Sequence, residues 1–194
     1  MGDTTLILLD VQNGVLDQLK NTDPYLNRLA FAVLTARNQN VKIIHVVTAF
    51  RPGYPESSPL NTSTKQVAES GLFQEGDHTT QIPPMLAPTP HEVIIKKRRI
   101  SAFFGTELDM ILRCSNINHI IIAGLVTSGS VLSTVRDAMD LDYGVTVLRD
   151  LCMDRDEEVH RVLMDKVFKR RVRVVNWDHS VDFSQSFAAL CRSA

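Results

Sequence analysis

The sequence predicts a three-layer α/β/α fold built around a central, mostly parallel sheet of six strands. Six short apolar runs recur along the chain, and helical stretches separate most of them. Wholly apolar runs are typical of strands that helices cover on both faces. Strands separated by helices connect through right-handed crossovers, which produce a mostly parallel sheet. With 194 residues, 44% of them hydrophobic, we expect a single domain over residues 1–194.

The predicted strands share a run of aliphatic residues bounded by polar ones. The first run covers residues 6–9 and ends abruptly at Asp10. The other five cover residues 41–49, 92–95, 119–123, 145–148 and 172–175. Each run is short enough to be a strand, because a helix usually needs ten residues or more.

Helices are predicted where apolar residues recur every three or four positions. One follows Pro24 and extends through Leu34. A second follows Thr106, a residue type that often caps the first turn of a helix. Residues 131–139 and 159–167 have a similar periodicity, so helices are expected there as well.

Residues 50–90 interrupt this alternation. The segment contains seven of the eight prolines, and neither a helical nor a strand period is sustained in it. A long irregular segment inside a compact domain usually covers a site or mediates assembly. The mixture of aromatic and polar residues over 50–56 favours a lid, with a surface insertion as the alternative.

Charge and cysteine content exclude several classes of protein. Lys and Arg total 21 against 22 for Asp and Glu, so the chain has no basic field to hold a nucleic acid. Charged residues interrupt every apolar run before it could cross a membrane, and we expect no signal peptide. The three cysteines, Cys114, Cys152 and Cys191, form neither a disulfide framework nor a thiolate zinc motif. We therefore expect a cytoplasmic protein.

Three polar residues lie just beyond predicted strands, where ligands bind in open parallel sheets. Asp10 follows the first strand, and its carboxylate suits a proton acceptor, although it could also cap the next helix. Lys97 belongs to a cluster of four cations after the third strand. The cluster could be a solvated strand end, or one member could turn inward to stabilise a developing anion.

Ser130 is the third of these residues, in a turn of small residues over 123–130 that leads into a helix. Such turns bind anions through free N–H groups, so Ser130 could be a nucleophile, a donor or a cap. Glycine-rich nucleotide motifs and the G-x-S-x-G elbow are absent from the sequence. The six histidines, His45, His78, His91, His119, His160 and His179, lack metal-binding spacing, so no metal is predicted.

Three blocks of sequence together resemble the isochorismatase-like superfamily, also called cysteine hydrolases. They are LLDVQN at 8–13, KRRISAFFGT at 97–106, and AGLVT at 123–127 followed by VLSTVRDA at 131–138. The resemblance implies a Rossmann-like hydrolase domain that acts on a small polar molecule without a cofactor. It also implies a homo-oligomer, a dimer or tetramer, to which residues 50–90 and the apolar segment 181–190 could contribute.

The resemblance places an aspartate, a lysine and a nucleophilic cysteine at Asp10, Lys97 and Ser130. It implies a cis peptide bond between Val126 and Thr127, with main-chain N–H groups nearby forming an oxyanion hole. Residues expected to contribute to this hole or to substrate binding are Val126, Thr127, Gln12, Phe103 and Tyr54. The metal-bearing branch of the family has an Asp and His cluster after the second strand, and this chain has RPGY there.

Serine at position 130 leaves three explanations open, because a hydroxyl is a weaker acid and a poorer nucleophile than a thiol. It could replace a natural cysteine of an amide or imide hydrolase. The enzyme could instead act without a covalent step, as isochorismatase does on the vinyl ether of isochorismate. The domain could also bind a ligand without turnover. Cys152 is considered as a displaced nucleophile, but its acidic neighbours favour an inert thiol.

Overall fold

The computed structural model describes residues 4–177, which form a six-stranded sheet with helices on both faces. The strands are β1 (Thr4–Leu9), β2 (Lys42–Thr48), β3 (Val93–Lys97), β4 (His119–Leu125), β5 (Gly144–Met153) and β6 (Arg173–Val175). Their order is β3-β2-β1-β4-β5-β6, and every neighbouring pair is parallel. His179, Cys191 and the segment 181–190 lie outside the described residues.

Six α-helices connect or cover these strands. They are α1 (Asn13–Leu16), α2 (Thr22–Asn38), α3 (Thr62–Ser70), α4 (Leu108–Cys114), α5 (Leu132–Asp140) and α6 (Glu157–Val162). Short 3₁₀ turns lie at η1 (His78–Thr80), η2 (Pro84–Leu86) and η5 (Phe168–Arg170). Two π-helical turns, η3 (Thr127–Val131) and η4 (Leu163–Val167), adjoin α5 and α6. Within residues 4–177, no helix combines the length and the apolar character that a membrane span requires.

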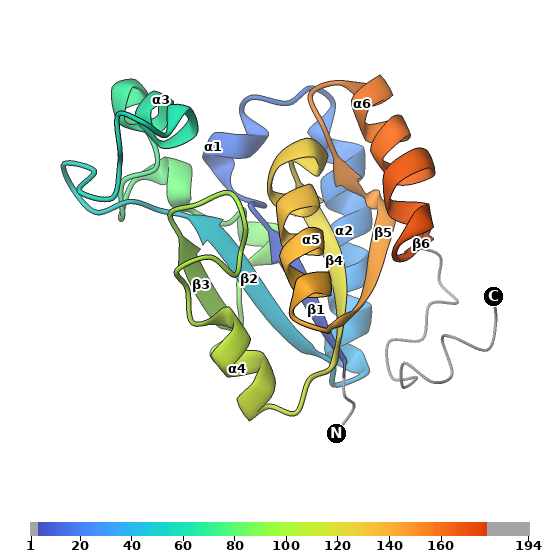
Figure 1. The fold of residues 1–194 in the computed structure, drawn as a ribbon. Coiled ribbons are helices and arrows are strands. Elements are labelled where there is room, and N and C mark those ends of the chain that lie inside the picture. Colours follow the sequence, from blue (N-terminus) through green and yellow to red (C-terminus); the bar gives the residue numbers. More distant parts are fainter. Residues whose placement is uncertain (1–3, 178–194) are drawn as a thin grey trace.

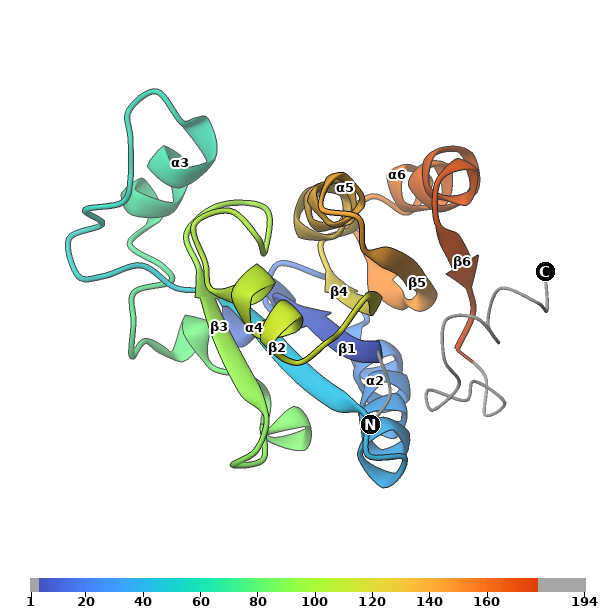
Figure 2. The same cartoon turned by 60° about the horizontal axis from the view of Figure 1, so that its bottom comes forward.

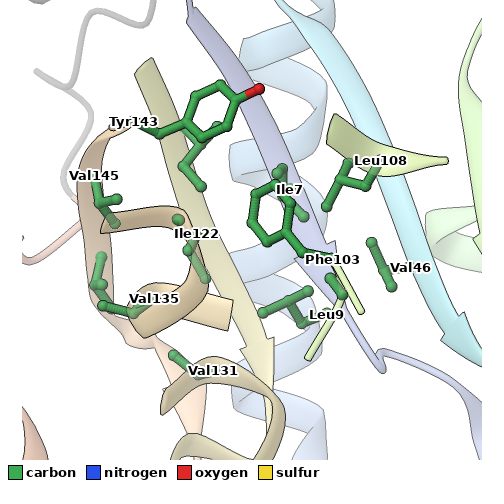
Figure 3. Close-up of a cluster of buried hydrophobic side chains, with 14 of the residues drawn as sticks. Ile7, Leu9, Val46, Phe103, Leu108, Ile122, Val131, Val135, Tyr143 and Val145 are labelled. Atoms are coloured by element: carbon green, nitrogen blue, oxygen red, sulfur yellow. The ribbon is translucent and has the colours of Figure 1, made fainter. Parts of the chain in front are cut away.

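The helices divide between the two faces of the sheet, as Figure 2 shows. The helix α2 covers one face, where Leu29 and Val33 pack against Leu6 and Leu8 of β1. The helices α4 and α5 cover the opposite face (Figure 3). Met164 and Phe168, from the segment that follows α6, belong to the same core cluster. All six residues of β1 are buried, as expected for a central strand with helices on both sides.

The predicted architecture is confirmed: the sheet is parallel throughout and each of the six apolar runs forms a strand. The boundaries differ most at β5, which extends through Met153, so Cys152 lies within the strand and not after it. The pairing of β4 with β5 shifts between Ile122 and Gly124, and this irregularity accommodates the extra length.

The prediction that residues 50–90 lack regular structure is wrong over α3. The Asn61 side chain accepts a hydrogen bond from the Thr64 N–H at 3.1 Å and so caps the helix. Gly71 ends it in the left-handed conformation at φ 70°. Figure 1 shows α3 standing beyond the tip of β2, away from the helices that cover the sheet.

The far end of the same segment is tied to the loop that follows β1. The Gln12 amide donates to the Thr48 and Thr79 carbonyls, each at 3.0 Å, and accepts the Thr48 N–H at 2.7 Å. A Cβ at Gly14 would lie 2.6 Å from Thr79 and 2.8 Å from Phe73, so only glycine allows this packing. The segment is therefore closely packed against the end of β1 and β2.

Candidate active site

Asp10 occupies the position directly after β1, where the chain leaves the sheet. Its φ of 51° is left-handed, and its N–H donates to the Val46 carbonyl of β2 at 2.8 Å. The side chain is buried. One carboxylate oxygen, Oδ1, accepts a hydrogen bond from the Thr48 hydroxyl at 2.9 Å. The other, Oδ2, faces both a cation and a second hydroxyl.

Lys97 supplies that cation from the end of β3. Its Nζ lies 2.9 Å from Asp10 Oδ2 and donates to the Thr48 hydroxyl at 2.9 Å and to the Arg99 carbonyl at 3.2 Å. Lys97 is 2% exposed, so this member of the cationic cluster does turn inward. The register pairs Thr48 with Lys97 across β2 and β3, which brings both side chains to the same edge of the sheet.

Ser130 supplies the second hydroxyl, and its Oγ donates to Asp10 Oδ2. It lies in η3, the π-helical turn between β4 and α5, and it is buried. The turn reaches Asp10 because β4 approaches β1 closely at Gly124. A Cβ there would lie 2.6 Å from the Leu9 nitrogen, and its φ of 138° also favours glycine. The structure thus brings Asp10, Lys97 and Ser130 together.

The cis peptide bond lies one position earlier than the resemblance implies. It joins Leu125 and Val126, whereas the sequence comparison placed it between Val126 and Thr127. The bond therefore lies at the end of β4, where the strand gives way to the turn that carries Ser130.

A cavity of about 630 Å³ opens over these three side chains, a size typical of sites for small molecules. Lys97, Asp10 and Ser130 line it together with residues of α3 and of the loops after β2, β3, β4 and β5. Phe50, Leu72 and Phe73 contribute apolar surface from the segment 50–90. This segment therefore forms part of the cavity wall.

Of the five other predicted site residues, Val126 lines the cavity and four do not. Gln12 is fully buried and its amide joins β2 to η1. The Tyr54 hydroxyl donates to the Leu72 carbonyl at 2.8 Å, which turns the ring toward its own segment. These two residues hold the wall of the cavity in place and do not contact its interior.

Phe103 and Thr127 also lie elsewhere. Phe103 stacks on Tyr143 with ring centroids 5.7 Å apart, inside the core beneath α4 and α5 (Figure 3). The Thr127 side chain is buried and shares a 2.8 Å hydrogen bond with His160 Nδ1. His160 thus supports the turn that carries Ser130, and burial lowers the pKa of its imidazole below the usual value.

Sequence analysis did not identify two residues that contact the site, Thr48 and Asp154. Thr48 contacts both Asp10 and Lys97, and it lies at the carboxyl end of a strand, so the rule that selected the other residues applies to it as well. Asp154 accepts the N–H of Ser128 at 2.6 Å and so holds the same turn from the end of β5. No sequence signal identifies Asp154, because its role depends on how β5 and η3 meet.

Cys152 does not reach the site. It is buried in β5 opposite Gly124 and is not among the residues that line the cavity. Burial raises the pKa of its thiol to about 12, with a smaller contribution from the Asp150 carboxylate. Since the thiolate is the nucleophilic form, the raised pKa and the position outside the cavity both disfavour Cys152 as a nucleophile.

Across residues 4–177, His, Cys, Asp and Glu side chains nowhere gather in groups of three or more that could hold a metal ion. Asp10 is the single carboxylate among the described residues of the cavity wall. The absence of a metal stays a prediction for the chain as a whole.

Comparison with known proteins defines the class and then the family. The six-stranded, parallel α/β fold is isochorismatase-like, and residues 4–179 match the sequence model of the Isochorismatase domain. The chain therefore belongs to the isochorismatase family, whose members are hydrolases.

Several solved structures share this fold. A cysteine hydrolase from Pseudomonas syringae pv. phaseolicola 1448A is 22% identical with a TM-score of 0.83, covering 90% of this chain and 88% of its own. An isochorismatase family protein from Desulfovibrio vulgaris subsp. vulgaris str. Hildenborough is 25% identical with a TM-score of 0.80, covering 91% and 95%. N-carbamoylsarcosine amidase from Thermoplasma acidophilum is 21% identical with a TM-score of 0.75, covering 94% and 100%.

Proposed function

We propose that this protein cleaves an amide or imide C–N bond in a small polar molecule, with Asp10, Lys97 and Ser130 as its catalytic residues. The observation that carries the proposal is the hydrogen bond from the Ser130 hydroxyl to the same Asp10 oxygen that Lys97 contacts at 2.9 Å. A nucleophile within reach of a base, with a third group orienting that base, is the arrangement covalent hydrolases share.

In the proposed reaction, Ser130 Oγ attacks the carbonyl carbon of the substrate and passes its proton to Asp10. The new C–O bond creates a tetrahedral intermediate, and the main-chain N–H groups of Val126 and Ser130, two residues of the cavity wall, would stabilise its oxyanion. Collapse of the intermediate breaks the C–N bond, and the leaving nitrogen takes the proton from Asp10. A water molecule then gives a proton to Asp10, attacks the ester carbon and releases Ser130 with its proton restored.

Lys97 and Thr48 prepare Asp10 for this proton transfer. The Lys97 ammonium group contacts Oδ2, and the Thr48 hydroxyl holds Oδ1 at 2.9 Å, so the carboxylate has one orientation. Burial strengthens these interactions because little water competes for them. Lys97 also stabilises negative charge on the reacting group as it develops.

The family contains an amidase of similar fold, N-carbamoylsarcosine amidase, which supports the choice of a C–N bond. To test the proposal, ammonia release is measured with purified protein on a panel of primary amides and N-carbamoyl amino acids. With a substrate from this panel, we expect Asp10→Asn and Ser130→Ala each to lower kcat/KM by about 1000-fold or more. Ser130→Cys retains turnover because it supplies a better nucleophile.

Asp23→Asn is the matched control for Asp10→Asn, because it changes an exposed aspartate of α2 in the same way. Circular dichroism and thermal unfolding check that each variant is folded. Full activity of folded Asp10→Asn would refute the role of this carboxylate. Absence of turnover on every panel member, with ligand binding retained, would favour a binding module instead.

A second candidate is hydrolysis of the vinyl ether of isochorismate without a covalent step. Serine in place of the expected cysteine favours it, because this path requires no thiol. Asp10 would act as acid and base, and water would be the nucleophile. Pyruvate release from isochorismate, retained in Ser130→Ala and lost in Asp10→Asn, would support this reaction over the covalent one.

A further inference from the structure

The cavity wall carries more positive than negative charge. Its described residues include the cations Lys97, Arg98, Arg99 and Arg155, and Asp10 is the one acid among them. Lys97 and Asp10 balance one another across 2.9 Å. The three arginines therefore decide what charge a ligand meets above the catalytic residues.

Arg98 is balanced by acids outside the cavity. Its Nη2 lies 2.7 Å from the Glu75 carboxylate, and its Nε lies 3.4 Å from the Glu56 carboxylate. Its Nη1 donates to the Lys96 carbonyl at 3.2 Å. These contacts turn its donors toward the protein, so Arg98 has little capacity left to bind a ligand.

Arg99 has a different environment. Its Nη1 donates to the carbonyls of Arg98 at 2.7 Å and of Glu56 at 3.2 Å, which are neutral acceptors. Among the described residues it forms no ion pair with a carboxylate. The side chain is half-buried, and its backbone carbonyl accepts from Lys97 Nζ at 3.2 Å, so its backbone is fixed directly beside the catalytic lysine.

Arg155 has a neutral partner as well. Its Nη2 donates to the Gln18 side-chain oxygen, and Gln18 in turn donates to the Gly14 carbonyl at 2.7 Å. Within residues 4–177 this guanidinium also forms no ion pair. Gln18 itself lines the cavity, so the contact holds Arg155 at the wall without neutralising its charge.

The two unbalanced arginines reach the cavity from opposite sides of the site. Arg99 follows β3 and Arg155 follows β5, and in the sheet these strands lie two positions to either side of β1, which carries Asp10. Phe50, Phe73 and Ile100 contribute apolar side chains to the wall of the same cavity. A guanidinium presents paired donors that match both oxygens of a carboxylate.

We infer that the substrate carries a carboxylate on an apolar body, and that Arg99 and Arg155 select it over the corresponding neutral molecule. The inference rests on the proposed function for the position of the reacting bond at Asp10, Lys97 and Ser130. The carboxylate replaces the missing counter-charge, and the apolar body contacts the aromatic wall. Arg99 and Arg155 are thus specificity-determining residues.

The test compares two probes of nearly the same shape, N-carbamoylphenylalanine, which is an anion, and its carboxamide, which is neutral. Binding is measured by calorimetry with the Ser130→Ala protein, which keeps the Asp10–Lys97 pair. We expect the acid to bind about tenfold or more tightly than the amide. Arg99→Gln and Arg155→Gln, each added to Ser130→Ala, are expected to weaken binding of the acid by a similar factor and to leave the amide unchanged.

Arg113→Gln is the matched control, because it removes the same charge from α4 at a position 57% exposed and away from the cavity. If Arg113→Gln weakened binding of the acid as much as the two cavity variants do, the effect would come from the overall charge of the protein, and the inference would be wrong. Equal affinity for the acid and the amide, or no binding of the acid, would overturn it too. Because binding is measured without turnover, failure of the proposed reaction would be seen separately, in the ammonia assay.

Discussion

The strand β3 has a buried ionic cluster at each end, and the two clusters differ in what lies beside them. At the amino end, Glu92 accepts from Arg37 at 2.7 and 2.9 Å, from His45 at 3.0 Å and from the Thr89 N–H at 3.1 Å. At the carboxyl end, Asp10 accepts from Thr48, Lys97 and Ser130. Ion pairing and burial alone would not distinguish a structural cluster from a candidate catalytic one.

The two clusters differ in whether a cavity opens onto them and in the kind of group that contacts the carboxylate. The Glu92 carboxylate is enclosed by Arg37, His45 and the backbone, and none of these residues lines the cavity over Asp10. Asp10, Lys97 and Ser130 all line that cavity, and one partner of Asp10 is a hydroxyl that can lose its proton. A buried carboxylate is thus a candidate for catalysis when a cavity and a transferable proton accompany it.

Removing the cation at the carboxyl end is expected to have the largest effect. Lys97→Met leaves Asp10 buried without its counter-ion, so kcat/KM should fall by about 100-fold or more and stability by about 3 kcal/mol. Lys96→Met is the matched control, because Lys96 is the preceding residue and its side chain is 50% exposed. Comparable losses in both variants, measured by kinetics and urea unfolding, would contradict a special role for Lys97.

At the amino end, Glu92→Gln should reduce stability and leave kcat unchanged. The substitution removes charge-assisted hydrogen bonds to Arg37 and His45, which we expect to cost about 2 kcal/mol in urea unfolding. A variant with lowered kcat but normal stability would erase the distinction between the two clusters.

The same variant should change the pH dependence of stability. Burial raises the pKa of Glu92, but the hydrogen bonds from Arg37 and His45 outweigh burial and lower it from 4.5 to about 2. A carboxyl with a lowered pKa stabilises the fold above its unfolded value, and this contribution is lost as the pH falls from about 4.5 to about 2. Unfolding measured across this range should show a shallower slope for Glu92→Gln than for the wild type.

A smaller effect is expected from the hydroxyl that orients Asp10. Thr48→Val removes the contacts to Asp10 and Lys97 with little change in shape, and we expect kcat to fall by about tenfold. Thr48→Ser keeps the hydroxyl and should restore most of the rate. If the Val and Ser variants had equal kcat values, the hydrogen bonds of the Thr48 hydroxyl would not determine the rate.

The smallest effect on kcat is expected at Asp154, which supports the turn that carries Ser130. Asp154→Asn weakens the acceptor of the Ser128 N–H, and kcat should fall by about threefold with KM unchanged. Asp156→Asn is the neighbouring control, because Asp156 caps α6 through the N–H groups of Glu158 and Val159. The control should alter thermal stability slightly and leave kcat as it is.

The sequence was sufficient to predict the parallel sheet and the convergence of Asp10, Lys97 and Ser130. The reason is physical: the carboxyl ends of parallel strands meet at one edge, so residues at those ends are neighbours whatever their separation in the chain. The same rule missed Thr48, because the predicted second strand, 41–49, extends past this residue, whereas β2 ends at Thr48. The domain extent, the cytoplasmic location and the oligomeric state stay predictions.

The helix α3 and the position of Phe103 could not be predicted in this way. Of the nine residues of α3, Thr64 alone is buried, so the helix lacks the apolar periodicity that reveals most helices. Its signals were Asn61 at the start and Gly71 at the end. Phe103 follows a strand that leads to the site, but its ring turns back into the core, and only packing determines that direction.

The glycine at 124 has a consequence for how the protein can diverge. Because a Cβ there would collide with the backbone of Leu9, a saturation library at this codon should yield glycine in every active clone. At Gly53, where φ is 79° and open space surrounds the Cα, asparagine or aspartate should survive selection. The contrast in tolerated substitutions between Gly124 and Gly53 would thus show that β1 and β4 lie close together at Gly124, without any structural measurement.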